Sequence, residues 1–96
     1  MKMRLVRFVL GANKRAEAEG IADRIVPIIR SQPGCDGCTF FIDDESGYCG
    51  LVVMWASKDA ADAAAAVVAP VLGEELEAAG AASVERHLFD VYEPST

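Results

Sequence analysis

The sequence predicts one α+β domain over residues 1–96, with the ferredoxin-like order βαββαβ and a four-stranded antiparallel sheet. Two observations lead to this fold class. Segments with the two-residue period of strands alternate with segments whose apolar residues recur every three or four positions, as in helices. In addition, 96 residues suffice for one modest hydrophobic core and leave no room for a second domain.

The first strand is predicted over residues 3–10, "MRLVRFVL", and it is apolar on both faces. Val6, Phe8 and Leu10 fall on one side, whereas Met3, Leu5 and Val9 fall on the other. The following helix is expected to be capped by Asn13, bent by Pro27 and ended by Pro33 and Gly34. Its apolar positions have helical spacing: Ala18, Ile21, Ala22, Ile25, Ile28 and Ile29.

A β-hairpin is predicted from residues 38–42 and 48–55, joined by the polar turn "DDESG". In this hairpin Cys49 is expected to lie nearly opposite Phe41. Ser57 is expected to cap an alanine-rich helix, which Pro70 restarts as a second segment and Gly80 closes. Residues 83–92 complete the sheet as its last strand.

Apolar residues occur on both faces of the predicted sheet, in pairs such as Leu5 and Phe8 or Phe40 and Phe41. Two helices can cover only one face of four strands. A second copy of the chain is the simplest cover for the other face, so we expect a homodimer that packs sheet against sheet.

The composition excludes several classes of partner. Nine Lys and Arg against fifteen Asp and Glu give a formal net charge of −6, which disfavours nucleic acid. No apolar stretch approaches the length of a membrane-spanning helix, and the N-terminal segment lacks the features of a signal peptide. We therefore expect a soluble, cytoplasmic protein. Its odd number of cysteines, three, is compatible with reduced thiols.

Four motifs, in this order and spacing, cover nearly the whole chain: "RFVLG", "PGCDG", "GLVVMWASKDAADA" and "HLFDVYE". Together they resemble the antibiotic-biosynthesis monooxygenase family of the dimeric α+β barrel superfamily. The resemblance implies oxidation of a small, electron-rich aromatic or quinol substrate by O2 without a metal, flavin or other cofactor. It also implies that the protein binds the substrate anion, excludes water and manages protons. The rival function is a non-catalytic dimeric module of the same fold that serves in small-ligand binding or in interaction.

Haem degradation, which another branch of the superfamily performs, is disfavoured. By the resemblance, that branch uses an Asn, a strand-end Trp and a His on the second helix. Only Trp55 matches here, because Arg4 stands near the Asn position and the second helix has no histidine.

Three residues are candidates for catalysis: Trp55, His87 and Arg4. Trp55 fits either a pocket wall with an inward N–H or hydrophobic cover for a helix. His87, the only histidine, fits either a general base or a packed residue on a strand face. Arg4 shares two alternatives with Arg7 and Arg86, an anion contact or an ion pair with Glu85 or Asp90. The other candidate substrate-binding residues are Phe40 and Tyr48.

The pair Cys35 and Cys38 has the C-x-x-C spacing of redox and metal sites. The pair is expected to precede a strand, so no helix N-terminus is present to activate a thiolate. A zinc site from these residues with Cys49 and His87 fits in ligand type. The hairpin, however, separates Cys49 from Cys38 along the strands, and we therefore predict no metal site.

Overall fold

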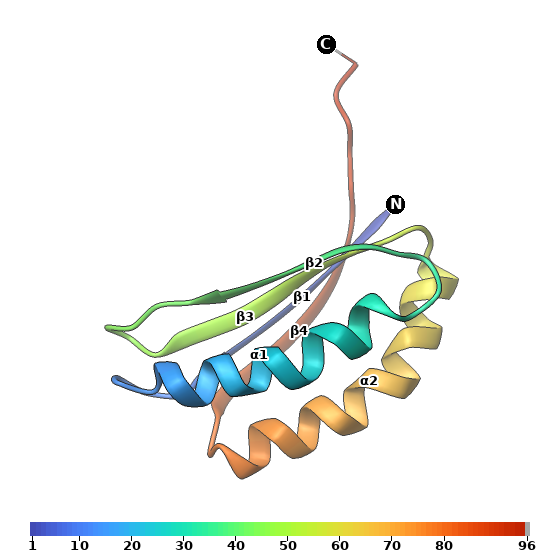
Figure 1. Cartoon of the computed structure of the whole chain (residues 1–96). Helices are drawn as coiled ribbons and strands as arrows, with labels where there is room; N and C mark the ends of the chain where they lie inside the picture. Colours follow the sequence, from blue (N-terminus) through green and yellow to red (C-terminus); the bar gives the residue numbers. More distant parts are fainter. Residues whose placement is uncertain (96) are drawn as a thin grey trace.

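The computed structural model describes residues 1–95, and it has the predicted order of elements. The elements are β1 (Lys2–Val9), α1 (Arg15–Arg30), β2 (Cys35–Ile42), β3 (Tyr48–Trp55), α2 (Lys58–Ala78) and β4 (Ala82–Asp90). The strands form one sheet in the order β2-β3-β1-β4, and every neighbouring pair is antiparallel. Both helices cover the same face of this sheet (Figure 1). The predicted ferredoxin-like α+β fold is therefore confirmed.

The core lies between the sheet and the helices, and β1 at the centre of the sheet shows how the sequence builds it. Val6 and Phe8 point toward the helices and are 3% and 0% exposed. Leu5 pairs with Val52 on one side and with His87 on the other, on the opposite face. The alternation of β1 therefore sorts its side chains between two different environments, as predicted.

Helix α1 presents Ala18, Ile21, Ile25 and Ile29 to the core, in agreement with the predicted spacing. The predicted cap is wrong. Lys14 occupies the N-cap position without a side-chain hydrogen bond, and Asn13 adopts a left-handed conformation with φ of 60° in the preceding turn. Asn tolerates this conformation better than most residues, so the sequence uses it for the turn instead.

Helix α2 begins as predicted, because the Ser57 side chain accepts a hydrogen bond from the backbone N–H of Ala60 at 3.1 Å. The predicted break at Pro70 is wrong, since the helix continues without interruption to Ala78. Pro70 is exposed, and Val68 and Leu72 on either side of it are buried in the core. This packing holds the helix together across the hydrogen bond that proline cannot donate.

Gly80 closes α2, as predicted. It has φ of +69°, which favours glycine. The N–H of Gly80 donates to the Glu77 carbonyl at 3.1 Å, and the N–H of Ala81 donates to the Leu76 carbonyl at 2.9 Å. These two bonds form a Schellman motif, which satisfies the last carbonyls of the helix and turns the chain toward β4.

Strand β2 differs from its prediction in start and register. It begins at Cys35, not Cys38, and Asp36 is an extra residue that shifts the pairing with β3 between Cys35 and Gly37. In the hairpin Cys49 pairs with Ile42, one residue from the predicted Phe41. Strand β4 ends at Asp90, and residues 91–95 run away from the body of the molecule (Figure 1).

The sheet face away from the helices, called the open face below, carries half-buried apolar side chains from three strands. They are Met3, Leu5, Val9, Phe41, Val52 and Met54. Phe89 of β4 lies on the same face and is 44% exposed. Within residues 1–95, no helix has the length and apolar character needed to cross a membrane.

Candidate functional site

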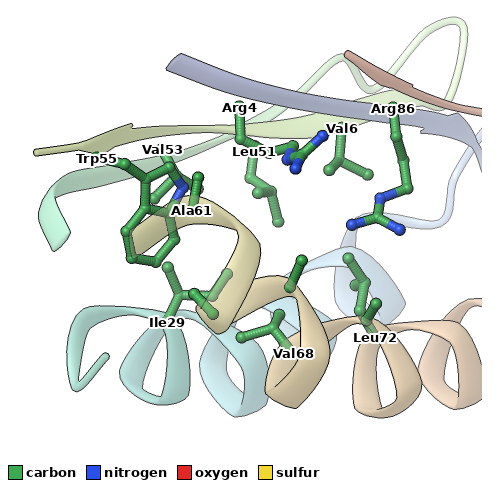
Figure 2. A pocket seen from close by; sticks show the side chains of 13 residues that line it. Arg4, Val6, Ile29, Leu51, Val53, Trp55, Ala61, Val68, Leu72 and Arg86 are labelled. Atoms are coloured by element: carbon green, nitrogen blue, oxygen red, sulfur yellow. The ribbon is translucent and has the colours of Figure 1, made fainter. Parts of the chain in front are cut away.

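A cavity of about 30 Å³ lies between the sheet and α2, beside Trp55. Figure 2 shows side chains from β1, β3, β4 and both helices around it. Its lining is Arg4, Val6, Ile29, Leu51, Val53, Trp55, Ala61, Ala64, Ala65, Val68, Ala69, Leu72 and Arg86. A cavity of this size holds a water molecule but no aromatic ring, since benzene occupies engineered cavities of roughly 150 Å³. We call this space the Trp55 cavity.

Trp55 combines the two roles that the sequence left open. Its side chain is 3% exposed and belongs to the core, yet it also forms one end of the Trp55 cavity. Among residues 1–95 its indole N–H has no hydrogen-bond partner, and the nitrogen is not sealed inside the core. The ring nitrogen lies on the side of the indole that faces Arg4 (Figure 2). The N–H is therefore available to a group bound in the cavity.

Arg4 and Arg86 reach the same cavity from neighbouring strands. Both guanidinium groups point into the space between the sheet and α2 (Figure 2), and neither forms an ion pair with any other residue in the range 1–95. Burial lowers the pKa of Arg4, the charge of Arg86 lowers it further, and Asp62 partly opposes both effects. Two positive groups without a paired carboxylate make this cavity a site suited to an anion.

Arg7 forms an ion pair, which is the second of the two alternatives predicted for the three arginines. Its side chain bonds to Glu85 on β4, and its guanidinium carbon lies 5.8 Å from the centre of the Tyr48 ring. The bond to Glu85 is the main cause of the raised pKa of Arg7. All three residues lie on the open face, so Arg7 and Tyr48 are separated by the sheet from the Trp55 cavity.

His87 also lies on the open face, opposite Leu5. Its ring stacks on Phe89, with 5.8 Å between ring centres. Phe40 lies on the helix side, where its ring meets the edge of Phe8 at 6.3 Å between centres, but it does not line the Trp55 cavity. Of the seven predicted site residues, the cavity therefore brings together Trp55, Arg4 and Arg86.

The alanines of α2 belong to the site, although they are not among the residues predicted from the sequence. Ala61, Ala64, Ala65 and Ala69 form the cavity wall opposite the sheet. Their three- and four-residue spacing places them on one helix face, and this spacing was the available signal. Small side chains on that face leave the space that the two arginines enter.

The cysteines do not form a common site with His87. Cys38 and Cys49 are buried on the helix side of the sheet, whereas His87 lies on the open face. Burial raises the pKa of both thiols. In the part of the chain that the structure describes, no three His, Cys, Asp or Glu side chains are grouped so that they could hold a metal ion.

The chain is similar in structure to several solved proteins, some of which are named as oxygenases or monooxygenases. SnoaB, a cofactor-independent oxygenase from Streptomyces nogalater, is 26% identical with a TM-score of 0.77, over 98% of this chain and 95% of its own. A protein from Deinococcus radiodurans, described as a candidate antibiotic biosynthesis monooxygenase, has a TM-score of 0.85 at 14% identity, over 100% and 97%. A third protein, from Caulobacter crescentus and described in the same way, has a TM-score of 0.78 at 18% identity, over 96% and 90%.

No protein-family model matches the sequence, and no curated protein matches it either. The family relationship therefore depends on structure together with the motifs in the sequence. Neighbours that align over nearly all of both chains bear the family's name, and one of them is an oxygenase that works without a cofactor. The chain has the fold of the antibiotic-biosynthesis monooxygenases, the family that its sequence motifs resemble.

Proposed function

We propose that the protein is a cofactor-independent monooxygenase of the antibiotic-biosynthesis type, which oxidises a small electron-rich aromatic or quinol substrate beside Trp55. The observation that carries this proposal is the convergence of Arg4, Arg86 and the free Trp55 N–H on one apolar cavity. Cationic and N–H donors in such a place stabilise a phenolate or enolate. Such an anion is also the form of the substrate that passes an electron to O2.

For an anthrone-like substrate the reaction converts a ring CH2 group and O2 into a carbonyl group and water. One oxygen atom enters the product, the other leaves as water, and the substrate supplies all the electrons. The chain's part is to bind the anion at the two guanidinium groups and to keep bulk water away between the sheet and α2. The position of His87 on the open face supports its packing role rather than that of a base in this cavity.

Substrate entry requires the cavity to widen, because about 30 Å³ is too small for an aromatic ring. Arg4 and Arg86 are long, flexible side chains that line the site, so their rotation is the simplest way to open it. The small volume is also the observation that favours the second candidate, a dimeric binding or interaction module without catalysis.

Oxygen uptake separates the two functions. The protein is mixed with a hydroxyanthrone or a quinol in the presence of a metal chelator, and oxygen consumption is followed with an electrode while quinone formation is followed by absorbance. A protein-dependent rate above autoxidation, with one O2 consumed per anthrone, supports the monooxygenase. Binding of the same compounds with no added oxygen consumption supports the binding module.

We also propose that a second copy of the chain covers the open face. The support is the set of half-buried apolar residues on that face, which the helices of the same chain leave uncovered. Burial of such a face against an identical one stabilises a symmetric dimer.

A further inference from the structure

A second cavity, of about 160 Å³, lies next to the Trp55 cavity along α2. It lies between Leu72, Gly73 and Leu76 of α2 on one side and Val84 and Arg86 of β4 on the other. Val6, Ala69, Leu72 and Arg86 line both cavities. The two spaces are therefore adjoining parts of one groove, and Arg86 stands where they meet. We call the larger part the Gly73 cavity.

The arrangement of the layers explains why this groove exists. Helix α2 packs over β1 and β3, whereas β4 at the edge of the sheet receives little cover. Val84 is 48% exposed, and all residues of β4 except Leu88 are exposed. The groove is the uncovered strip between α2 and this edge strand.

We propose that the two cavities form a single binding slot for an aromatic anion, in which the Gly73 cavity seats the apolar bulk and Arg86 holds the anionic group. This inference deepens the proposed function, because it assigns the substrate's larger part to a place away from Trp55. The sizes support the assignment. About 160 Å³ matches the cavities of roughly 150 Å³ that bind benzene, whereas about 30 Å³ does not.

The chemistry of the lining supports the class of ligand. Apart from Arg86, the residues around the Gly73 cavity are apolar: Val6, Ala69, Leu72, Gly73, Leu76 and Val84. A guanidinium without an ion-pair partner among residues 1–95 provides both a charge for an anion and a flat face for an aromatic ring. An aromatic ligand with an acidic group can contact the apolar lining with its rings and the Arg86 guanidinium with its charge.

Gly73 is the residue without a side chain in the wall of the larger cavity. A side-chain carbon added at this position would meet no atom within 4 Å, so the space above it is open. Alanine is the better helix former, and glycine here leaves additional room beside Leu72 and Leu76. A side chain at residue 73 would therefore meet no obstacle at its first carbon, and we expect a large one to occupy part of the cavity.

The test uses two fluorescent probes with the same aromatic rings. One is 1-anilinonaphthalene-8-sulfonate, an anion, and the other is N-phenyl-1-naphthylamine, which lacks the sulfonate. We expect Gly73→Leu to weaken binding of the sulfonate about ten-fold or more, while Gly73→Ala changes it less than about three-fold. Arg86→Met should weaken the sulfonate by the same factor and leave the neutral probe within about three-fold. Arg15→Met, which removes an equal charge at the start of α1, should affect neither.

A second measurement does not depend on variants. Amide shifts of the parent protein titrated with the sulfonate should change in α2 around residues 69–76 and in β4 around residues 84–86. Changes confined to the open face, failure to bind at millimolar concentration, or unaltered binding in folded Gly73→Leu would overturn the proposal. Neither measurement involves turnover. If the probes bind as expected and no oxygen is consumed, the binding slot is supported and the monooxygenase function is not. If oxygen is consumed and the probes do not bind as expected, only the binding slot is overturned.

Discussion

Cys35 is the strand partner of Trp55, because the extra residue Asp36 shifts the register at the start of β2. The shift places Cys35 and Cys38 on the same face of the sheet, where they pair with Trp55 and Val53 of β3. Cys35 is half-buried at the edge of the core, whereas Cys38 is 6% exposed and lies inside it. The two thiols of the C-x-x-C motif therefore differ in accessibility.

Alkylation of the folded protein should follow this difference. Burial raises the pKa of Cys38 and Cys49, so at pH 8 both remain thiols and are shielded from reagent. We expect iodoacetamide to modify Cys35 first, as measured by mass spectrometry of peptides. All three should react in denaturant. Modification of Cys38 or Cys49 at the rate of Cys35 would disagree with the structure.

Light scattering should give about twice the chain mass of 10.2 kDa at micromolar concentration. Leu5→Glu places a charge at the centre of the open face, opposite Val52 and His87, and should yield monomers. Val67→Glu on the outer side of α2, where Val67 is 50% exposed, is the matched control and should remain a dimer. A folded parent that scatters as a monomer would rule out the barrel.

Trp55→Phe should lower turnover far more than it lowers thermal stability. The substitution keeps an aromatic ring in the core and removes the N–H that faces the cavity. Loss of one such donor typically reduces the rate by about 10²–10³. Oxygen uptake measures the rate, and the melting temperature measures stability. Tyr92→Phe, at a residue that is 82% exposed, is the control and should keep the parental rate.

Two weaker variants accompany that test. Arg4→Met removes a charge from the Trp55 cavity and should raise KM for an anionic substrate. His87→Ala acts on the open face, so it should alter the assembly before it alters turnover. If Trp55→Phe consumes oxygen at the rate of the parent protein, Trp55 is not the proposed hydrogen-bond donor.

Gly50→Ala should destabilise the fold by about 1–3 kcal/mol. A side-chain carbon at residue 50 would come within 2.3 Å of the Val6 carbonyl oxygen and 2.4 Å of the Phe41 ring, and the backbone atom cannot move aside. Gly37→Ala on β2 is the matched control, since nothing lies within 4 Å of its added carbon. That variant should be neutral or stabilising by about 0.4–1 kcal/mol. Chemical denaturation compares the two, and equal losses would contradict the contacts around Gly50.

The Arg24–Glu75 pair should make stability depend on pH. Arg24 holds the carboxylate with bonds of 2.8 and 2.6 Å, and this contact lowers the pKa of Glu75 from the ordinary value of 4.5. A lowered folded pKa contributes stability above 4.5, and the contribution is lost as the pH falls through the folded value. Glu75→Gln should therefore melt below the parent at pH 7, by at most roughly a few degrees for an exposed pair.

The two melting temperatures should converge as the pH falls below 4.5. Glu77→Gln removes the same charge two residues along α2, where no ion pair forms within the described range 1–95, and it should show no such convergence. A constant difference between Glu75→Gln and the parent across this range would mean that the carboxylate charge is not the cause.

The sequence predicted the order of elements because each element carries its own period. Phe8 and Leu5 differ by an odd number of positions in β1, so they had to occupy opposite faces of the sheet. The break at Pro70 was a local rule, and it failed because Val68 and Leu72 hold the helix to the core on both sides of the proline. The bulge at Asp36 had no comparable signal, because a register shift depends on both strands.

The site was predictable only in part for the same reason. Arg4 and Arg7 stand three positions apart in a strand, so the sequence already places them on opposite faces. The face on which Arg86 lies depends on how β4 pairs with β1. Arg86 pairs with Val6, so it lies on the helix side together with Arg4. Ion-pair partners follow from that register, which is why Glu85 binds Arg7 while Arg4 and Arg86 face the cavity.

The alanine wall of α2 limits how the size of the Trp55 cavity can change in descendants of this protein. Ala61, Ala64, Ala65 and Ala69 already carry nearly the smallest side chains available, so almost every replacement there narrows the site. Enlargement must come from residues on the sheet side, such as Leu51 or Val53, or from Leu72. Mutations at the four alanines would exclude ligands, whereas mutations at Leu51, Val53 or Leu72 to smaller residues would admit larger ones. Differences in ligand preference between descendants are therefore expected at these three larger residues and not at the alanines.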